Sequence, residues 1–315
     1  MESSTYWRSY KNRHNFKCKE REMQKTHLLF FIAVNLKRKE KNIMAKKMII
    51  DYKNFDLEEI KARMNDVINH INDNATDDFV AYFGKEIIAK ADRILFERGY
   101  LTYEEFTELF GVHFNMDMTG KMETLFGLST SCLVNPYCLA RMLNGENVCA
   151  YCFSAATQAR YANVRENGID NFLILNEVVI PTEYWPIMEN DMLRGESFGD
   201  QYTWRQSANF NNFFARNTQA NCALWMKNPW VMAEALAKGS VKPSNVQYIY
   251  SSLKVNSEES EIFERYPFID KVFTVFNDEY IEENGIEINC GARSCRGCGD
   301  CYHKGTCPYR RERLK

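Results

Sequence analysis

Short apolar segments with the pattern of β-strands alternate with helix-like segments along the chain from Met122 onward. The predicted strands lie within residues 122–129, 190–197, 221–227, 245–252 and 271–276, the predicted helices lie within 156–167, 204–217 and 230–239, and residues 171–180 fit a helix or a strand–helix mixture. Segments that alternate in this way form βαβ units, which build parallel sheets. We therefore predict an α/β fold over residues 121–285, with a parallel sheet that is open or closed into a partial (β/α) barrel.

Residues 44–120 have helical signals and form a predicted helical preface to this sheet. A first helix is predicted to begin with a capping box of Asp56 and Glu59. Its apolar side chains fall on one helical face and are Ile60, Met64, Val67, Ile68 and Ile71. A second helix is predicted from Thr76 to Arg98, and a third, short one is predicted to open at Thr102. We assign no chemistry to this preface.

The amino-terminal 43 residues differ in charge from the rest of the chain. Residues 1–43 hold 11 Lys and Arg against 4 Glu, a net of +7, and since the whole chain carries −2, residues 44–315 carry −9. Reverse translation of Lys39 and Glu40 allows a ribosome-binding sequence shortly before Met44. We therefore expect residues 1–43 to be a non-native or disordered leader. The acidic remainder does not support nucleic acid as a partner.

The cysteine content indicates reduced thiols. The chain has 11 cysteines in 315 residues, an odd number and a low density for a secreted disulfide scaffold. Its apolar run at residues 28–34 is seven residues long and too short to span a bilayer. We expect a cytoplasmic protein with no membrane segment, in which clustered cysteines bind metal.

Nine of the cysteines fall into two groups. The first cysteine group is Cys132, Cys138, Cys149 and Cys152, and the second cysteine group is Cys290, Cys295, Cys298, Cys301 and Cys307. A pair such as Cys149–Cys152 with two upstream cysteines fits zinc. This group nevertheless follows a predicted strand directly, and functional residues gather at the carboxyl ends of strands in parallel sheets.

The second cysteine group contains a Cys-x-x-Cys-x-x-Cys run followed by a Cys-Pro pair. This order resembles ferredoxin ligation and predicts a [4Fe–4S] cluster, with zinc as the alternative. The gap before Cys307 is five residues where ferredoxins have three, so the fourth ligand is either Cys307 or Cys290. The predicted metal-binding tail spans residues 286–315.

Two families resemble parts of this sequence. The segment CAYCF is similar to the second half of the radical S-adenosylmethionine (SAM) signature, with Tyr151 as its aromatic residue and Gly145 where the signature has a cysteine. RGES, residues 194–197, resembles the motif that holds the SAM amino group, with Glu196 as the acid. The cysteines of the tail resemble auxiliary clusters of SPASM-type enzymes.

A closer resemblance is to the phage "gene product 88" family of uncharacterised, cysteine-rich proteins. The blocks STSC, CFSAATQARYANVRENGIDNF and RGESFGD occur in the same order as in that family, over roughly residues 122–276. The family blocks match Cys132, Cys138 and Cys152, whereas Cys149 is an addition. The resemblance implies phage or prophage origin and assigns no activity.

Together these resemblances imply an iron–sulfur enzyme that uses SAM in a bacterial cytoplasm, with an unknown substrate and a reductant protein such as a flavodoxin or ferredoxin. Cys132, Cys138 and Cys152 would bind the cluster, Glu196 would hold SAM, and Asp200, Lys227 and Asn228 would line the substrate mouth. The alternative is a non-enzymatic zinc or iron–sulfur protein that contacts host protein or nucleic acid through the basic segment RRERLK. A solvated chain end is the plainer interpretation of that segment.

Overall fold

The computed structural model of the chain describes residues 57–116, 118–144 and 147–314. The predicted leader, residues 1–43, and Asp56 of the predicted capping box lie outside the described residues.

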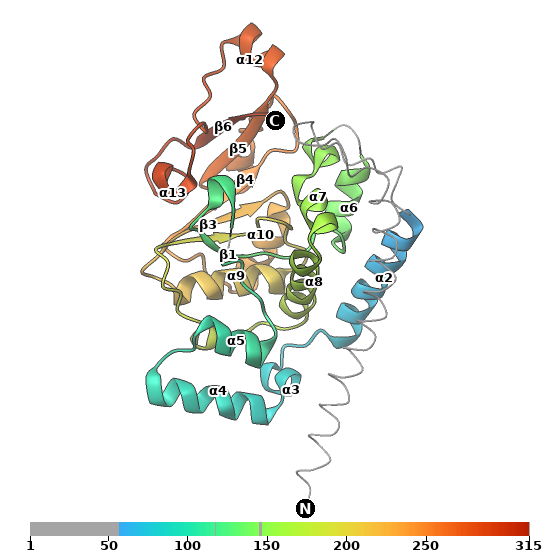
Figure 1. Cartoon of the computed structure of the whole chain (residues 1–315), viewed down its shortest axis with the longest axis vertical. Coiled ribbons are helices and arrows are strands. Elements are labelled where there is room, and N and C mark those ends of the chain that lie inside the picture. The colour runs from blue at the N-terminus through green and yellow to red at the C-terminus, as the bar shows by residue number, and fades with distance from the viewer. Residues whose placement is uncertain (1–56, 117, 145–146, 315) are drawn as a thin grey trace, which may run out of the picture. The chain divides into compact units, whose positions relative to one another are not determined.

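The described residues form a mixed α/β fold (Figure 1). Its strands are β1 (Phe126–Leu128), β2 (Met192–Gly195), β3 (Asn221–Met226), β4 (Val246–Ser251), β5 (Lys271–Phe276) and β6 (Tyr309–Arg313). The helices before the sheet are α2 (Leu57–Asn74), α3 (Phe79–Phe83), α4 (Lys85–Arg98), α5 (Tyr103–Phe110) and η2 (Gly120–Met122). The remaining helices are α6 (Pro136–Leu143), η3 (Val148–Tyr151), α7 (Phe153–Arg160), α8 (Ala162–Glu177), η4 (Thr182–Tyr184), α9 (Trp204–Arg216), α10 (Pro229–Ala237), α11 (Ile262–Arg265), α12 (Asp278–Asn284) and α13 (Cys295–Cys298).

The six strands form one sheet in the order β1-β2-β3-β4-β5-β6, and every pair is parallel. Each strand therefore lies beside the strand that precedes it in the chain. The crossover helices α8, α9 and α10 contribute side chains to one apolar cluster on one face of the sheet, as right-handed crossovers predict for this strand order. Helix α13, between β5 and β6, lies against the other face. The predicted parallel α/β sheet is confirmed.

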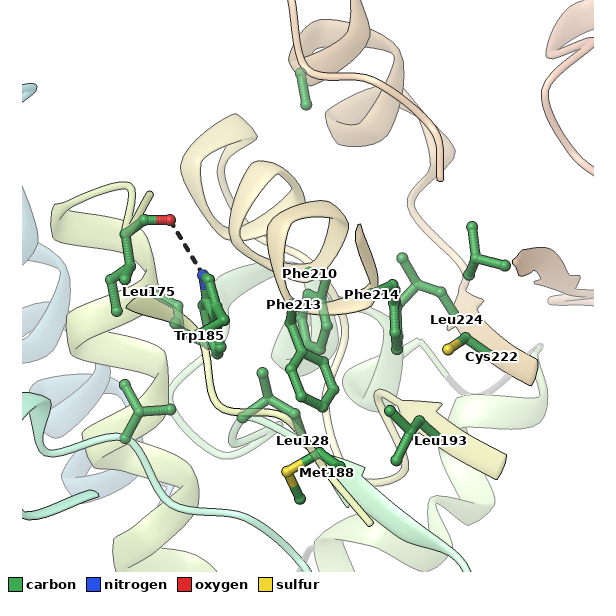
Figure 2. Close-up of a cluster of buried hydrophobic side chains, with 14 of the residues drawn as sticks. Leu128, Leu175, Trp185, Met188, Leu193, Phe210, Phe213, Phe214, Cys222 and Leu224 are labelled. Carbon is green, nitrogen blue, oxygen red and sulfur yellow. Dashed lines mark hydrogen bonds between the residues drawn. The ribbon is translucent and has the colours of Figure 1, made fainter. Parts of the chain in front are cut away.

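The two faces of the sheet have different covers, as the alternation of side chains along β3 shows. Cys222, Leu224 and Met226 belong to the large apolar cluster that contains the phenylalanines of α9, and Figure 2 shows part of it. Ala223 and Trp225 point the other way and pack with Tyr302 of the carboxyl-terminal segment. We call the first face the helix face and the second the tail face.

The basic carboxyl-terminal segment is part of the sheet. Residues Tyr309–Arg313 pair in parallel with β5, and Arg310 is only 2% exposed. The interpretation of RRERLK as a solvated end is therefore wrong for Arg310, whereas Arg313 at the end of β6 is exposed. The sequence does not predict this strand, because its residues are charged and a strand is usually recognised by alternating apolar residues.

Two predicted helices are interrupted. The predicted helix 76–98 is split into α3 and α4 at Gly84, which has a φ of 90° that favours glycine. The predicted helix 156–167 is likewise split into α7 and α8, with Tyr161 in an extended conformation between them. The start of α5 agrees with prediction, since Thr102 and Glu105 form a capping box.

Candidate functional site

The first cysteine group lies between the carboxyl end of β1 and the start of α7. Cys132 follows β1 in a loop, Cys138 lies on α6, Cys149 lies in η3, and Cys152 is the N-cap residue of α7. All four side chains pack in one apolar cluster with Leu139, Met142 and Ala155. The structure thus brings together the four cysteines that the sequence places 20 residues apart from first to last.

Cys132 and Cys152 are directly paired. The Cys132 thiol donates to Gln158 Oε1 at 3.5 Å and lies close enough to Cys152 for the two sulfurs to shift each other's pKa; the Cys152 sulfur accepts the Ala155 backbone N–H at 3.4 Å. These contacts, the one from Cys132 first, lower the pKa of Cys152 to about 6, whereas that contact and burial raise the pKa of Cys132 well above its usual value. Cys152 is therefore the thiolate of the group, held at the amino end of a helix.

Burial acts in the opposite direction on the other two thiols. Burial raises the pKa of Cys138 well above its usual value, and raises that of Cys149 to about 11 although Lys227 opposes the shift. Within the described residues, no three or more His, Cys, Asp or Glu side chains are arranged to hold a metal ion. The donor set itself suits a soft metal or an iron–sulfur cluster, because metal binding replaces thiol protons.

Glu196 follows β2 and connects the ends of β1 and β2. Its backbone N–H donates to Leu128 O at 3.0 Å, and its φ of 54° is rare for a residue other than glycine. The carboxylate accepts hydrogen bonds from Thr130 N at 3.1 Å, Thr130 Oγ1 at 2.8 Å and Gln206 Nε2 at 2.7 Å. Three of the roughly four acceptor positions of a carboxylate are thus filled.

The backbone passes closely over this carboxylate at Gly199. A Cβ atom there would lie 2.4 Å from Thr130 Oγ1 and 2.9 Å from Glu196 Oε2, so only glycine fits. The close approach brings the loop after β2 against the loop that leads to Cys132. Sequence reasoning found Glu196 but missed Thr130 and Gln206, whose roles depend on contacts distant in the chain.

Asp200 and Lys227 connect the ends of the next strands. The Asp200 carboxylate accepts from the backbone N–H groups of Gln201 at 2.8 Å and Lys227 at 2.7 Å. The Lys227 ammonium donates to Ser251 O at 3.1 Å and Ser251 Oγ at 2.6 Å, which ties the end of β3 to the end of β4. Asp200 is 3% exposed and Lys227 is half-buried.

The two other site residues predicted from the sequence, Asn228 and Tyr151, lie at the edge of the candidate site. Asn228 begins α10 and its side chain donates to Gln201 O at 3.5 Å, without capping the helix. Tyr151 is 53% exposed on η3. Tyr137, which the sequence did not suggest, donates to Lys227 O at 2.7 Å and so links α6 to the end of β3.

We expect the free energy of unfolding of the metal-free protein to rise by roughly 1–3 kcal/mol when the pH falls from about 7 to about 5. Burial raises the pKa of Glu196 to about 7 and that of Asp200 to about 6. Both acids titrate near pH 4 in an unfolded chain, so between about pH 4 and pH 7 these two carboxyls bind more protons in the folded state. Their contribution to stability therefore falls as pH rises through this window, and the lowered pKa of Cys152 offsets part of that change near pH 6 and above. Urea unfolding measures it, and Glu196→Gln should flatten the slope; a wild-type slope equal to the variant's would contradict the assignment.

The second cysteine group lies in the segment that covers the tail face. Cys295 and Cys298 are the first and last residues of α13, and Cys301 packs beside Tyr302. Electrostatic interactions join Cys290 to Cys295 and Cys301, and Cys295 to Cys298.

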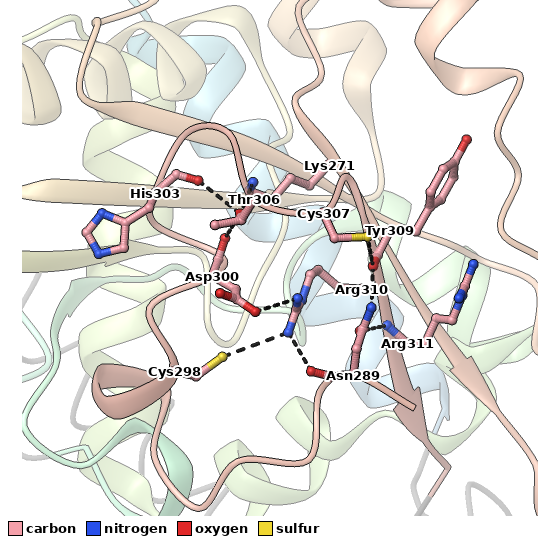
Figure 3. Close-up of polar contacts among 10 residues, drawn as sticks. All are labelled: Lys271, Asn289, Cys298, Asp300, His303, Thr306, Cys307, Tyr309, Arg310 and Arg311. Carbon is pink, nitrogen blue, oxygen red and sulfur yellow. Dashed lines mark hydrogen bonds and ion pairs between the residues drawn. The ribbon is translucent and has the colours of Figure 1, made fainter. Parts of the chain in front are cut away.

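Cys307 is set apart from these four. It is exposed, and its thiol donates to Tyr309 O at 3.3 Å (Figure 3). The two sequence alternatives for a fourth ligand therefore occupy different surroundings, and Cys290 is the one that lies with the CxxCxxC run.

The two cysteine groups lie at opposite ends of the strands. The first follows the carboxyl end of β1. The second is held near the amino ends, because Arg296 of α13 donates to Thr124 O at 3.3 Å and to Asn190 Oδ1 at 3.2 Å, just before β1 and β2. Figure 1 shows α13 and the α6–α7 pair on different sides of the strands.

Comparisons with known protein families, with curated proteins and with solved structures found no match for this chain. Among the described helices, none combines the length and apolar character needed to cross a bilayer.

Proposed function

We propose that the protein is an iron–sulfur enzyme of the radical SAM type, with its reactive cluster at the first cysteine group. The observation that carries this proposal is the meeting of four thiols from the β1–α7 segment at the carboxyl end of a parallel sheet. Parallel α/β folds place their chemistry at this end of the sheet.

The strand order supports the same proposal. In (β/α) barrels each parallel strand lies beside its predecessor, and the six strands here follow that order. We therefore interpret the sheet as a partial barrel whose tail face is the interior. Arg194 and Trp225 point into this interior, where the Arg194 guanidinium lies 4.3 Å from the centre of the Trp225 ring.

The proposal gives a role to the cysteines, to Glu196 and to Lys227. Cys132, Cys138 and Cys152 would hold a [4Fe–4S] cluster, which supplies an electron for the reductive cleavage of SAM. Glu196 retains about one free acceptor position, enough for one N–H of the SAM amino group. Lys227 acts electrostatically on Cys149 and Cys152 and would offset the negative charge of bound thiolates.

The proposed partners follow from this chemistry. The cluster needs an electron from a reductant protein such as a flavodoxin or ferredoxin, and the thiols need the reducing conditions of a bacterial cytoplasm. Asp200, Lys227 and Asn228 would line the substrate mouth, and the substrate itself is unknown.

A second candidate function is supported by one observation. Cys149 packs in the same apolar cluster as the other three cysteines of the first group. Four thiolates on one metal leave no open coordination position, and a closed site of that kind is structural. The protein would then be a non-enzymatic zinc or iron–sulfur binding protein that contacts host protein or nucleic acid.

Anaerobic purification separates the two candidates. We expect iron and acid-labile sulfide at the first group, visible absorption from the cluster, and release of 5′-deoxyadenosine from SAM on reduction. Zinc alone at both groups would exclude the enzyme. Cys222→Ala is the matched control, because Cys222 is fully buried in the large apolar cluster on the helix face and should change neither metal nor activity.

A further inference from the structure

Two sulfurs of the first cysteine group lie against the first turns of α7. Cys152 is the N-cap residue of this helix, and its sulfur accepts the Ala155 backbone N–H at 3.4 Å. The Cys132 thiol donates at 3.5 Å to Oε1 of Gln158, which lies one turn further along α7. The two sulfurs are close enough for each to be the main cause of the other's pKa shift. Cys132 and Cys152 are therefore a close pair, although they are 20 positions apart in the chain.

Gln158 holds the Cys132 thiol in its direction. Its Nε2 donates to Thr130 O at 3.2 Å, so its Oε1 faces the Ser131 hydroxyl, which donates to it at 2.9 Å, and the Cys132 thiol. Gln158 and Ser131 are both fully buried. The Cys132 side chain is thus held beside Cys152 by hydrogen bonds that need no metal.

The two sulfurs differ in their access to solvent. Cys132 is 2% exposed, whereas Cys152 is partly buried and has two exposed neighbours in the chain, Tyr151 at 53% and Phe153 at 65%. A reagent from solution therefore reaches Cys152 first. Cysteines at the amino ends of helices are suited to nucleophilic attack, and a second thiol beside such a cysteine can displace the group that it takes up.

We propose that Cys132 and Cys152 are a redox-active dithiol that exchanges with low-molecular-weight disulfides, with Cys152 as the attacking sulfur and Cys132 as the resolving one. Cys152 attacks one sulfur of the disulfide, forms a mixed disulfide and releases the other half. Cys132 then attacks the Cys152 sulfur, which forms the Cys132–Cys152 disulfide and releases the second half. The two protons of the cysteines pass to the two released thiols, so two cysteines are oxidised while one disulfide is reduced.

This inference does not depend on the function proposed above. The disulfide uses two sulfurs that the proposed enzyme gives to its cluster, so a chain with the disulfide cannot hold that cluster. The exchange is therefore measured on full-length protein from which a chelator has removed any metal. A chain that never held metal is still expected to form the disulfide, and a chain that forms no disulfide leaves the metal analysis unaffected.

Disulfide mapping tests the pairing. After treatment with oxidised glutathione, digestion without reductant and mass spectrometry should show a Cys132–Cys152 cross-link, and dithiothreitol should restore both thiols. Cys149→Ala is the matched control, because it removes the neighbouring thiol of the Cys149–Cys152 motif and should leave the cross-link in place. Absence of this cross-link from the wild type, or a Cys149–Cys152 cross-link in its place, would overturn the pairing.

The order of attack is tested with serine variants, which keep a hydroxyl in place of each thiol. Cys132→Ser should stop the exchange at the mixed disulfide and retain one glutathione on Cys152. Cys152→Ser should take up none on Cys132, because that sulfur is buried. Peptide mass spectrometry locates the glutathione, and its presence on Cys132 in Cys152→Ser would overturn the assigned order. If a serine variant does not fold, the mapping of the wild-type chain still decides the pairing.

Discussion

Cys152→Ala is expected to empty the first cysteine group of metal and to abolish any cleavage of SAM. The sulfur of Cys152 accepts the Ala155 N–H, and the neighbouring Cys132 thiol is the main cause that lowers the pKa of Cys152 to about 6. Removing it deletes a ligand and the N-cap of α7, a loss of roughly 1 kcal/mol by itself. Iron and sulfide analysis measures the first effect, and detection of 5′-deoxyadenosine measures the second.

Cys149→Ala is the comparison that gives this result its meaning. If Cys132, Cys138 and Cys152 are the ligands, Cys149→Ala keeps the cluster and the SAM cleavage. A cluster that acts on SAM needs an iron free of protein ligands, so three thiolates are compatible with catalysis and four are not. Complete loss of metal in Cys149→Ala would show a closed site or ligation by the Cys149–Cys152 pair.

Trp185→Ala is expected to lower the free energy of unfolding by about 3–5 kcal/mol. Trp185 is fully buried between the preface and α9; its ring lies 4.9 Å from that of Phe106 and 5.5 Å from that of Phe213, centre to centre. Its indole N–H donates to Ile180 O at 3.1 Å (Figure 2), and truncation removes this hydrogen bond, while Asn212 Nδ2 still donates to the same carbonyl at 2.9 Å.

Urea unfolding of the variant, monitored by far-UV circular dichroism, measures this loss. Phe96→Ala is the control, because Phe96 on α4 is 93% exposed and its removal should change stability by less than about 0.5 kcal/mol. A change below about 1 kcal/mol in Trp185→Ala would mean that the preface does not pack on the sheet through this ring.

The strands that sequence reasoning found are the apolar ones. β3, β4 and β5 each carry runs such as CALWM or VFTVF, and these agree with prediction. β6 carries Arg310, Arg311 and Arg313, and no local pattern identifies it. Its arginines are accommodated because Asp300, Glu258 and Asp278 happen to face them, which only the folded chain reveals.

The site shows the same division. The sequence predicted that the first cysteine group and Glu196 lie near one another, because they follow predicted strands and the carboxyl ends of parallel strands lie at the same edge of the sheet. The hydrogen bonds of Glu196 to Thr130 and Gln206 were not, because they join residues 66 and 10 positions away through the fold. The burial of Lys271 was not predictable either, because β5 has the pattern of an ordinary apolar strand with a lysine at its start.

The sequential strand order has a consequence for how the chain is made. Each strand leaves the ribosome after the strand it pairs with, so the sheet can grow at one edge during translation. Cys152 and Cys301 are 149 positions apart, which corresponds to about 7–30 s of synthesis. Throughout that interval the first cysteine group is complete while the tail face lacks its cover. The two cysteine groups are therefore made one after the other, and the second begins to exist only when residues 290–301 have left the ribosome.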